Sequence, residues 1–162
     1  LSNANYPDNA EVLLVRTSPT GELIWQKQSG SSRGDIAHAL IKGKKNTIYL
    51  VGYTAELAGN LSDPMILQIN EDGLVMSKTV LQTGVEARIM NGYMNSGEHK
   101  LYGSGYIRDS PDAPWDPFLV EFDLKKGKHK VTRVKVPEST GELFGIRPFG
   151  PSKRAYLPSF GM

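Results

Sequence analysis

The chain has 162 residues, of which 39% are hydrophobic and 22% charged, which is typical of one globular domain and excludes a disordered charged tail. The 19 Lys and Arg residues against 17 Asp and Glu give a net charge of +2, too small to predict binding to nucleic acid or to an anionic membrane. The absence of cysteine excludes a disulfide scaffold, a thiol nucleophile and a cysteine-ligated metal, and no apolar run is long enough to span a bilayer.

The two ends of the chain do not look like ordinary termini of a domain. Residues 1–10, LSNANYPDNA, are small and polar without periodicity, so we expect a linker or a tag remnant there and a folded domain over 11–162. The chain starts with Leu1 and stops directly after a strand-like segment. These two features favour a segment excised from a longer protein.

From residue 11 onward, short alternating or apolar runs are each closed by Gly, Asn, Asp or Pro, which is the pattern of an all-β protein. Helical periodicity is almost absent. In chain order, the expected strands or strand-plus-turn segments are 11–21, 22–30, 35–41, 47–53, 63–73, 74–82, 86–93, 100–106, 116–127, 128–136, 142–148 and 154–160.

These segments repeat with a constant order. The runs EVLLVRTSPTG, DPMILQINEDG and DPFLVEFDLKKG start at Glu11, Asp63 and Asp116, which are 52 and 53 residues apart. In each repeat a later strand carries two aromatic residues four positions apart, with a small residue just before the second: Tyr49 and Tyr53, Tyr102 and Tyr106, Tyr156 and Phe160. Three four-stranded units of about 52 residues, at 11–62, 63–115 and 116–162, are typical of β-propeller blades. A twelve-stranded sandwich or open barrel is the alternative.

The first repeat, LLVRTSPTGELIWQKQSGSSRGDIAHALIKGKKNTIYLVGYT, resembles one unit of the bacterial β-propeller-like repeat proteins. Their units read roughly D-x-F-L-V-K-x-D-x-x-G-x-x-x-W, then G-x-x-x-D-x-A, then Y-x-V-x-G-Y-T. The resemblance is strong over 11–54, weaker over 63–106 and poor over 116–160, where the Trp is missing and Pro158 interrupts the last strand. It implies a propeller fold and a secreted or surface protein, so we expect an extracellular, periplasmic or cell-surface location.

The resemblance also implies a phase for the repeat, in which the strand that begins with an acid is the innermost of its blade. The chain then runs as an outer pair (11–30), two full blades (35–82 and 86–136) and an inner pair (142–160). The two pairs are complementary halves of one blade, as in propellers that close their ring by splitting a blade. Three units are too few for a ring, so we expect a partial propeller completed by further blades of a longer chain, or a homodimer that closes a six-bladed ring.

An acid recurs at the start of each predicted inner strand, at Asp35, Glu86 and Glu142. Inner strands converge on the central channel of a propeller, where carboxylates are suited to bind a polar ligand. The competing interpretation is structural, with the acid accepting hydrogen bonds from turn amides. Recurrence in every repeat favours the structural interpretation, because a binding site normally breaks the symmetry.

The segment IRDSPDAPWD at 107–116 departs most from the repeat, and its Arg108, Asp112 and Trp115 are candidate ligand-binding residues. An aromatic side chain beside charges suits contact with carbohydrate, peptide or protein; the alternative is a Pro-rich loop in which Trp115 packs on a neighbouring blade. The basic run at 125–130 predicts a solvated hairpin turn, with contact to a polyanion as the lesser alternative.

No catalytic motif, phosphate loop or metal-ligand spacing occurs, and we expect no cofactor, no metal and no nucleic-acid partner. The sequence therefore favours a non-catalytic binding module of unknown ligand. Two alternatives stay open: a hydrolase or lyase that acts on carbohydrate through channel-facing carboxylates, and a purely structural fragment of a longer propeller.

Overall fold

The structure, a computed structural model, describes residues 11–31, 34–55, 61–95, 97 and 99–134, and four further short strands between 141 and 161 of which only the backbone is described. The predicted linker at residues 1–10 lies outside the described residues. All described secondary structure is β, which confirms the all-β prediction. No helix in the described part of the chain is long and apolar enough to cross a membrane.

Ten of the strands follow the predicted segments closely. They are β1 (Val12–Thr17), β2 (Leu23–Ser29), β3 (Asp35–Lys42), β4 (Ile48–Thr54), β5 (Asp63–Ile69), β6 (Val75–Val80), β7 (Glu86–Met94), β8 (Lys100–Arg108), β9 (Asp116–Asp123) and β10 (Lys128–Arg133). The remaining four are β11 (Gly141–Leu143), β12 (Arg147–Phe149), β13 (Arg154–Tyr156) and β14 (Ser159–Gly161).

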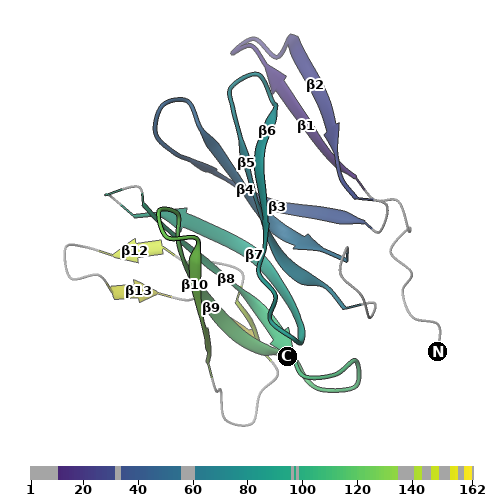
Figure 1. The fold of residues 1–162 in the computed structure, drawn as a ribbon, viewed down its shortest axis with the longest axis vertical. Helices are drawn as coiled ribbons and strands as arrows, with labels where there is room; N and C mark the ends of the chain where they lie inside the picture. Colours follow the sequence, from purple (N-terminus) through teal and green to yellow (C-terminus); the bar gives the residue numbers. More distant parts are fainter. Residues whose placement is uncertain are drawn as a thin grey trace.

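Two complete four-stranded antiparallel sheets form the centre of the molecule. Sheet I has the order β3-β4-β5-β6 and sheet II the order β7-β8-β9-β10, so each is a meander in which consecutive strands are neighbours. Before them along the chain, β1 and β2 form a two-stranded sheet, and Figure 1 shows the three sheets following one another from the top of the view, with β1 and β2, toward the bottom, with β7–β10. The two complete sheets coincide with the four-stranded segments expected at 35–82 and 86–136 rather than with the repeat units 11–62, 63–115 and 116–162, and β1 and β2 form a sheet of their own.

One backbone irregularity is common to both sheets and explains the small residue before the second aromatic. Gly52 pairs with Ala37, and Gly105 pairs with Ile89, in each case directly before a bulge in the first strand of the sheet. A Cβ at Gly52 would overlap the carbonyl oxygen of Ile36, and one at Gly105 that of Arg88. Only glycine permits this approach, so the Gly-Tyr dipeptide is a consequence of the bulge.

The hydrophobic core lies between successive sheets. Val12 and Leu14 of β1 pack on Leu50, Met65, Leu67 and Ile69 of sheet I. The opposite face of sheet I, with Ile41, Val51 and Ile66, packs on Ala87, Ile89, Leu101, Ile107, Phe118, Val120 and Phe122 of sheet II. The indole of Trp25 covers the β5–β6 turn, where a Cβ on Gly73 would lie 2.7 Å from the ring. Trp25 therefore packs against the core between β1 and sheet I.

The last strands form an interrupted hairpin. In β11 and β14 Glu142 lies opposite Phe160, and in β12 and β13 Arg147 lies opposite Tyr156, which continues almost the same register. The sequence predicts a pair of longer strands here. β11 lies against β8 and β9, much as β7 lies against β4 and β5.

Candidate functional site

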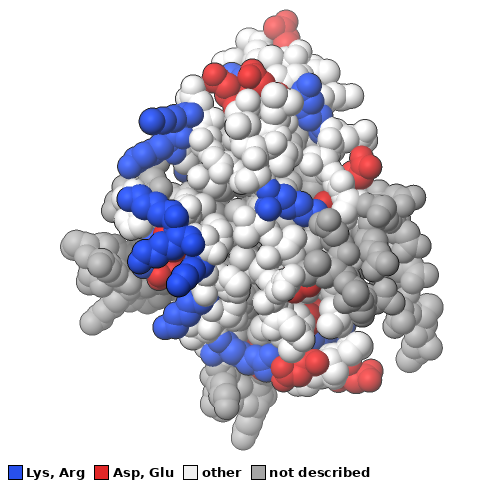
Figure 2. Space-filling model, in the orientation of Figure 1, with Lys and Arg blue, Asp and Glu red and all other residues white. Residues whose placement is uncertain are grey.

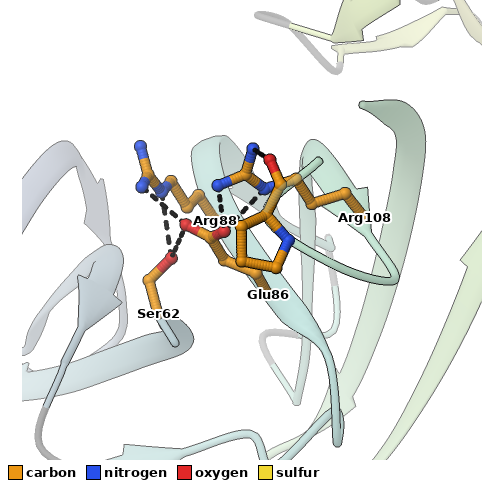
Figure 3. A network of polar contacts seen from close by, with 5 residues as sticks. Ser62, Glu86, Arg88 and Arg108 are labelled. Carbon is orange, nitrogen blue, oxygen red and sulfur yellow. Dashed lines mark hydrogen bonds and ion pairs between the residues drawn. The ribbon is translucent and has the colours of Figure 1, made fainter. Parts of the chain in front are cut away.

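The carboxylate of Glu86 is the centre of a network of polar contacts that joins five residues. It begins β7 and is buried. Its Oε1 accepts hydrogen bonds from Arg88 Nη2 at 2.7 Å and from the Ser62 hydroxyl at 3.2 Å, and its Oε2 accepts one from Arg108 Nε at 2.6 Å. Figure 3 shows both guanidinium groups directed at this carboxylate from the two sides. The Glu86 carboxylate therefore lies between two guanidinium groups.

Strand geometry explains why these side chains meet. Arg88 is two residues after Glu86 and projects from the same face of β7, while Arg108 lies directly opposite Glu86 in the β7–β8 ladder. Ser62 comes from sheet I, immediately before β5, and its carbonyl also accepts the Ala87 amide at 2.8 Å. The network therefore joins sheet I to sheet II.

Aromatic rings enclose the two arginines. The Arg88 guanidinium carbon lies 4.7 Å from the ring centroid of Tyr53, 5.9 Å from that of Tyr106 and 5.3 Å from that of Trp115. Arg108 lies 4.3 Å from the Trp115 centroid, and Trp115 meets Tyr106 edge-on with centroids 4.5 Å apart. Each such cation–π contact contributes about 0.5–1 kcal/mol at a partly exposed site. Tyr53 and Tyr106, the second aromatic residues of the first two repeats, thus both contact Arg88, which the repeat pattern alone does not indicate.

Ion pairs brace the loop that precedes β9, residues 109–115. Arg133 of β10 donates to both carboxylate oxygens of Asp109, at 2.8 and 2.7 Å, and also lies 3.3 Å from a carboxylate oxygen of Asp116. The hydrogen bonds from Arg133 hold the pKa of the Asp109 carboxyl below its usual value. Arg108 Nη1 donates to the Pro111 carbonyl from the other side. Asp112 remains exposed at the tip of this braced loop.

Asp35 occupies a different environment from Glu86. It is buried at the start of β3, where its carboxylate accepts hydrogen bonds from Lys78 Nζ at 3.1 Å and from the Ser31 hydroxyl at 3.3 Å. Its partners are side chains of β6 and of the segment before β3. The third acid, Glu142, lies in β11, and its side chain is outside the described residues.

The structure thus brings together Glu86, Arg108 and Trp115, places Asp112 nearby on the loop, and gives Asp35 its own ion pair. Sequence reasoning missed Arg88, Ser62 and Arg133. The period-two alternation from Glu86 to Arg88 was the available signal for the first of these. Ser62 and Arg133 depend on contacts between strands that only the register reveals.

The opposite end of the strands has a different character. Figure 2 shows lysine and arginine side chains gathered along the left edge of the molecule, where Figure 1 places the turns after β3, β7 and β9. In the last of these, Asp123 accepts the backbone amides of Lys125 and Lys126 at 3.0 Å, which forms the predicted hairpin turn. A hollow of about 300 Å³ between the ends of β3 and β7 lies at this same end, lined by 40–42 and 91–94.

Comparisons with known proteins add nothing to this geometry. No protein-family model matches the chain, and no curated protein matches it. In the described part of the chain, no three His, Asp or Glu side chains gather in a way that would hold a metal ion.

Proposed function

We propose that this chain is a non-catalytic binding module built from β-propeller-type repeats, with its ligand-binding face at the end that carries Glu86, Arg108 and Trp115. The observation that carries the proposal is the braced loop at 109–115. Arg133, Arg108 and Trp115 fix its two ends, while Asp112 at its tip is exposed. Loops held on a rigid β scaffold are where such folds place recognition.

The propeller reading is supported by the two successive four-stranded meanders and by their repeated bulge-and-glycine pairing. Their face-to-face stacking is the relation expected of neighbouring blades. A secreted or cell-surface location is part of the same proposal and is supported by the resemblance of the repeats to bacterial propeller-like proteins. The ligand class that suits an aromatic side chain beside charges is carbohydrate, peptide or protein surface.

The geometry around Glu86 argues against the hydrolase or lyase alternative at this residue. Both carboxylate oxygens accept hydrogen bonds from guanidinium groups. A general acid needs a proton on the carboxyl, and a nucleophile needs a free oxygen, so this environment is poorly suited to either role. A carboxylate that accepts hydrogen bonds from two guanidinium groups instead orients the arginines and the aromatic rings around them.

The test uses the purified 162-residue chain on a glycan array and a peptide library. We expect Asp112→Ala to weaken the binding of any hit by about tenfold or more, because an exposed loop residue contacts ligand without supporting the fold. Lys126→Ala and Asp72→Ala, on turns at the opposite end, are the matched controls and should bind normally.

Binding that survives Asp112→Ala and Trp115→Ala but is lost in the two control variants would contradict the assignment of the face. A chain that is folded and gives no hit on either array would favour the structural-fragment alternative. Turnover of an arrayed glycan that disappears in Glu86→Gln would establish the enzyme alternative.

A further inference from the structure

The two-stranded sheet β1–β2 exposes an apolar face. Val12 and Leu14 of β1 are buried against sheet I, but Leu13 and Val15, which alternate with them, are 57% and 52% exposed. Contiguous apolar side chains exposed on one face are typical of protein–protein interaction sites.

The repeat shows what these two positions require. By the 52- and 53-residue offsets, Leu13 and Val15 correspond to Met65 and Leu67 in sheet I and to Phe118 and Val120 in sheet II. Those four side chains are at most 1% exposed. The side chains at these two repeat positions are therefore buried in sheets I and II and exposed in β1.

The cover over the closed positions comes each time from the preceding sheet. Met65 and Leu67 pack against β1, and Phe118 and Val120 pack in the cluster that contains Val51 and Ile66 of sheet I. β1 has no sheet in front of it among the described residues. By analogy, a further four-stranded sheet stacked on β1 would bury Leu13 and Val15.

The edge of β1 is open as well. In the complete sheets β5 pairs with both β4 and β6, and β9 with both β8 and β10, whereas β1 pairs only with β2 among the described strands. An unpaired strand edge can form backbone hydrogen bonds with a strand of another chain, and the apolar face beside it can be buried in the same contact.

Not every exposed apolar residue belongs to this surface. Ile24 in β2 and Met76 in β6 both sit at a bulge, at equivalent positions of their units, and both are exposed. Met76 is 63% exposed although sheet I has neighbours on both faces. Exposure at that repeat position is a property of the unit, whereas exposure at Leu13 and Val15 is specific to β1.

We infer that Leu13 and Val15 form a docking surface for a second copy of this chain, whose sheet II stacks on them and whose C-terminal strands pair with the free edge of β1. Leu119 on sheet II corresponds to Leu14 on β1 and Ile66 on sheet I, residues that pack against the next sheet. The chain's own β11, at the start of the C-terminal hairpin, already lies against β8 and β9 of sheet II. A second copy therefore presents the inner strands and the stacking face together.

A second copy is favoured over the chain's own end because three units enclose too little interior for a ring, which needs about four to eight blades; this step rests on the propeller-type repeats of the proposed function. Two copies related by a two-fold axis repeat the same seam twice and give a closed assembly without free edges.

Sedimentation velocity over a range of concentrations tests the docking surface. We expect a sedimenting species with the mass of a dimer, twice the 17.8 kDa of one chain. The double variant Leu13→Lys with Val15→Lys should raise the dimer dissociation constant by about 100-fold or more, because it places two charges in the apolar contact. Met76→Lys, equally exposed but outside the surface, is the matched control and should remain dimeric. Circular dichroism establishes that all three chains fold.

Cross-linking tests the arrangement of the two copies. Chains with Leu13→Cys and chains with Leu119→Cys, mixed in equal amounts, should link to each other through a short bismaleimide, while each alone should not. A folded monomer at all concentrations, a dimer insensitive to the Leu13 and Val15 changes, or linkage of Leu13→Cys chains to themselves would overturn the inference. These outcomes are independent of ligand binding, which tests the proposed function separately.

Discussion

Sheets I and II share their strand order, their bulge and their Gly-Tyr pairing, yet they differ where their first strands begin. Asp35 lies opposite Thr54, two positions beyond the Gly52 pair, whereas Glu86 lies opposite Arg108, three positions beyond the Gly105 pair. A slip of one residue turns a strand side chain to the other face. The acids that begin β3 and β7 therefore point to opposite faces relative to the common bulge.

This slip explains the different partners of the two acids. Asp35 meets one amine, that of Lys78, which is partly exposed, while Glu86 meets two guanidinium groups that are themselves stacked on aromatic rings. Both β3 and β7 begin with a buried acid, but its position relative to the bulge and its partners are particular to each sheet. The difference teaches that the repeat supplies the framework and that single-residue offsets create the individual site.

Substitution of the glycines that face the bulges, Gly52 and Gly105, should lower the free energy of unfolding most, and by a similar amount in both sheets. Gly52→Ala and Gly105→Ala each place a Cβ against a backbone carbonyl, which the bulged strand accommodates only by moving. We expect each to lower the free energy of unfolding by about 3 kcal/mol, at the upper end for overpacking. Urea denaturation measures this.

Gly127→Ala is the control for these two variants, because a Cβ there meets no atom within 4 Å and only the positive φ of 63° is strained. We expect about 1 kcal/mol for it. A loss at Gly52 or Gly105 no greater than at Gly127 would show that the bulge does not depend on the glycine.

Substitution of the buried acid should lower the free energy of unfolding by different amounts in the two sheets. Glu86→Gln removes the carboxylate that Arg88 and Arg108 share in a largely buried position, so we expect a loss of about 2–3 kcal/mol. Asp35→Asn leaves a single lysine that can turn to solvent, and we expect a loss of about 1 kcal/mol. Thermal and urea unfolding of the two variants compare these losses directly, and equal losses would contradict the asymmetry argued above.

The all-β class, the strand order and the repeat were predictable from the sequence because they depend on local patterning. Turn glycines, alternating apolar residues and the 52-residue period lie within single units, and the ten strands up to 133 match the segments derived from them. The Glu86 network was only partly predictable. Glu86 and Arg108 were both candidate ligand-binding residues, but their contact depends on the register of β7 with β8, which the bulge shifts by one residue.

The contacts between sheets could not be predicted from the sequence, for a different reason. Tyr53 belongs to sheet I and Ser62 directly precedes its strand β5, and both contact Arg88 of sheet II only because the two sheets stack face to face. Nothing in the spacing of these residues marks them as partners. The loop at 109–115 was singled out for its composition, whereas its bracing by Arg133 follows from the pairing of β9 with β10.

The smallest expected effect concerns His38, the bulge residue of β3, whose ring stacks on Tyr53 with centroids 5.5 Å apart. Burial against its neighbours lowers the pKa of His38 below 6.5, and the positive charge of Arg88 lowers it further. A histidine with a lowered pKa disfavours its own protonation in the folded state. Its contribution to stability is therefore present above about pH 6.5 and is lost as the pH falls from there through the folded pKa.

Removal of the Arg88 charge tests whether this arginine of sheet II acts on sheet I. In Arg88→Met we expect the pKa of His38 to rise but to stay below 6.5, because burial, the larger cause, remains. Lys78→Met is the matched control: it removes a cation that binds Asp35 of the same strand, and it should leave the pKa of His38 unchanged. Titration of the histidine ring signals by NMR measures both variants. A pKa of His38 that does not move in Arg88→Met, or that moves equally in Lys78→Met, would mean that Arg88 does not couple the two sheets electrostatically.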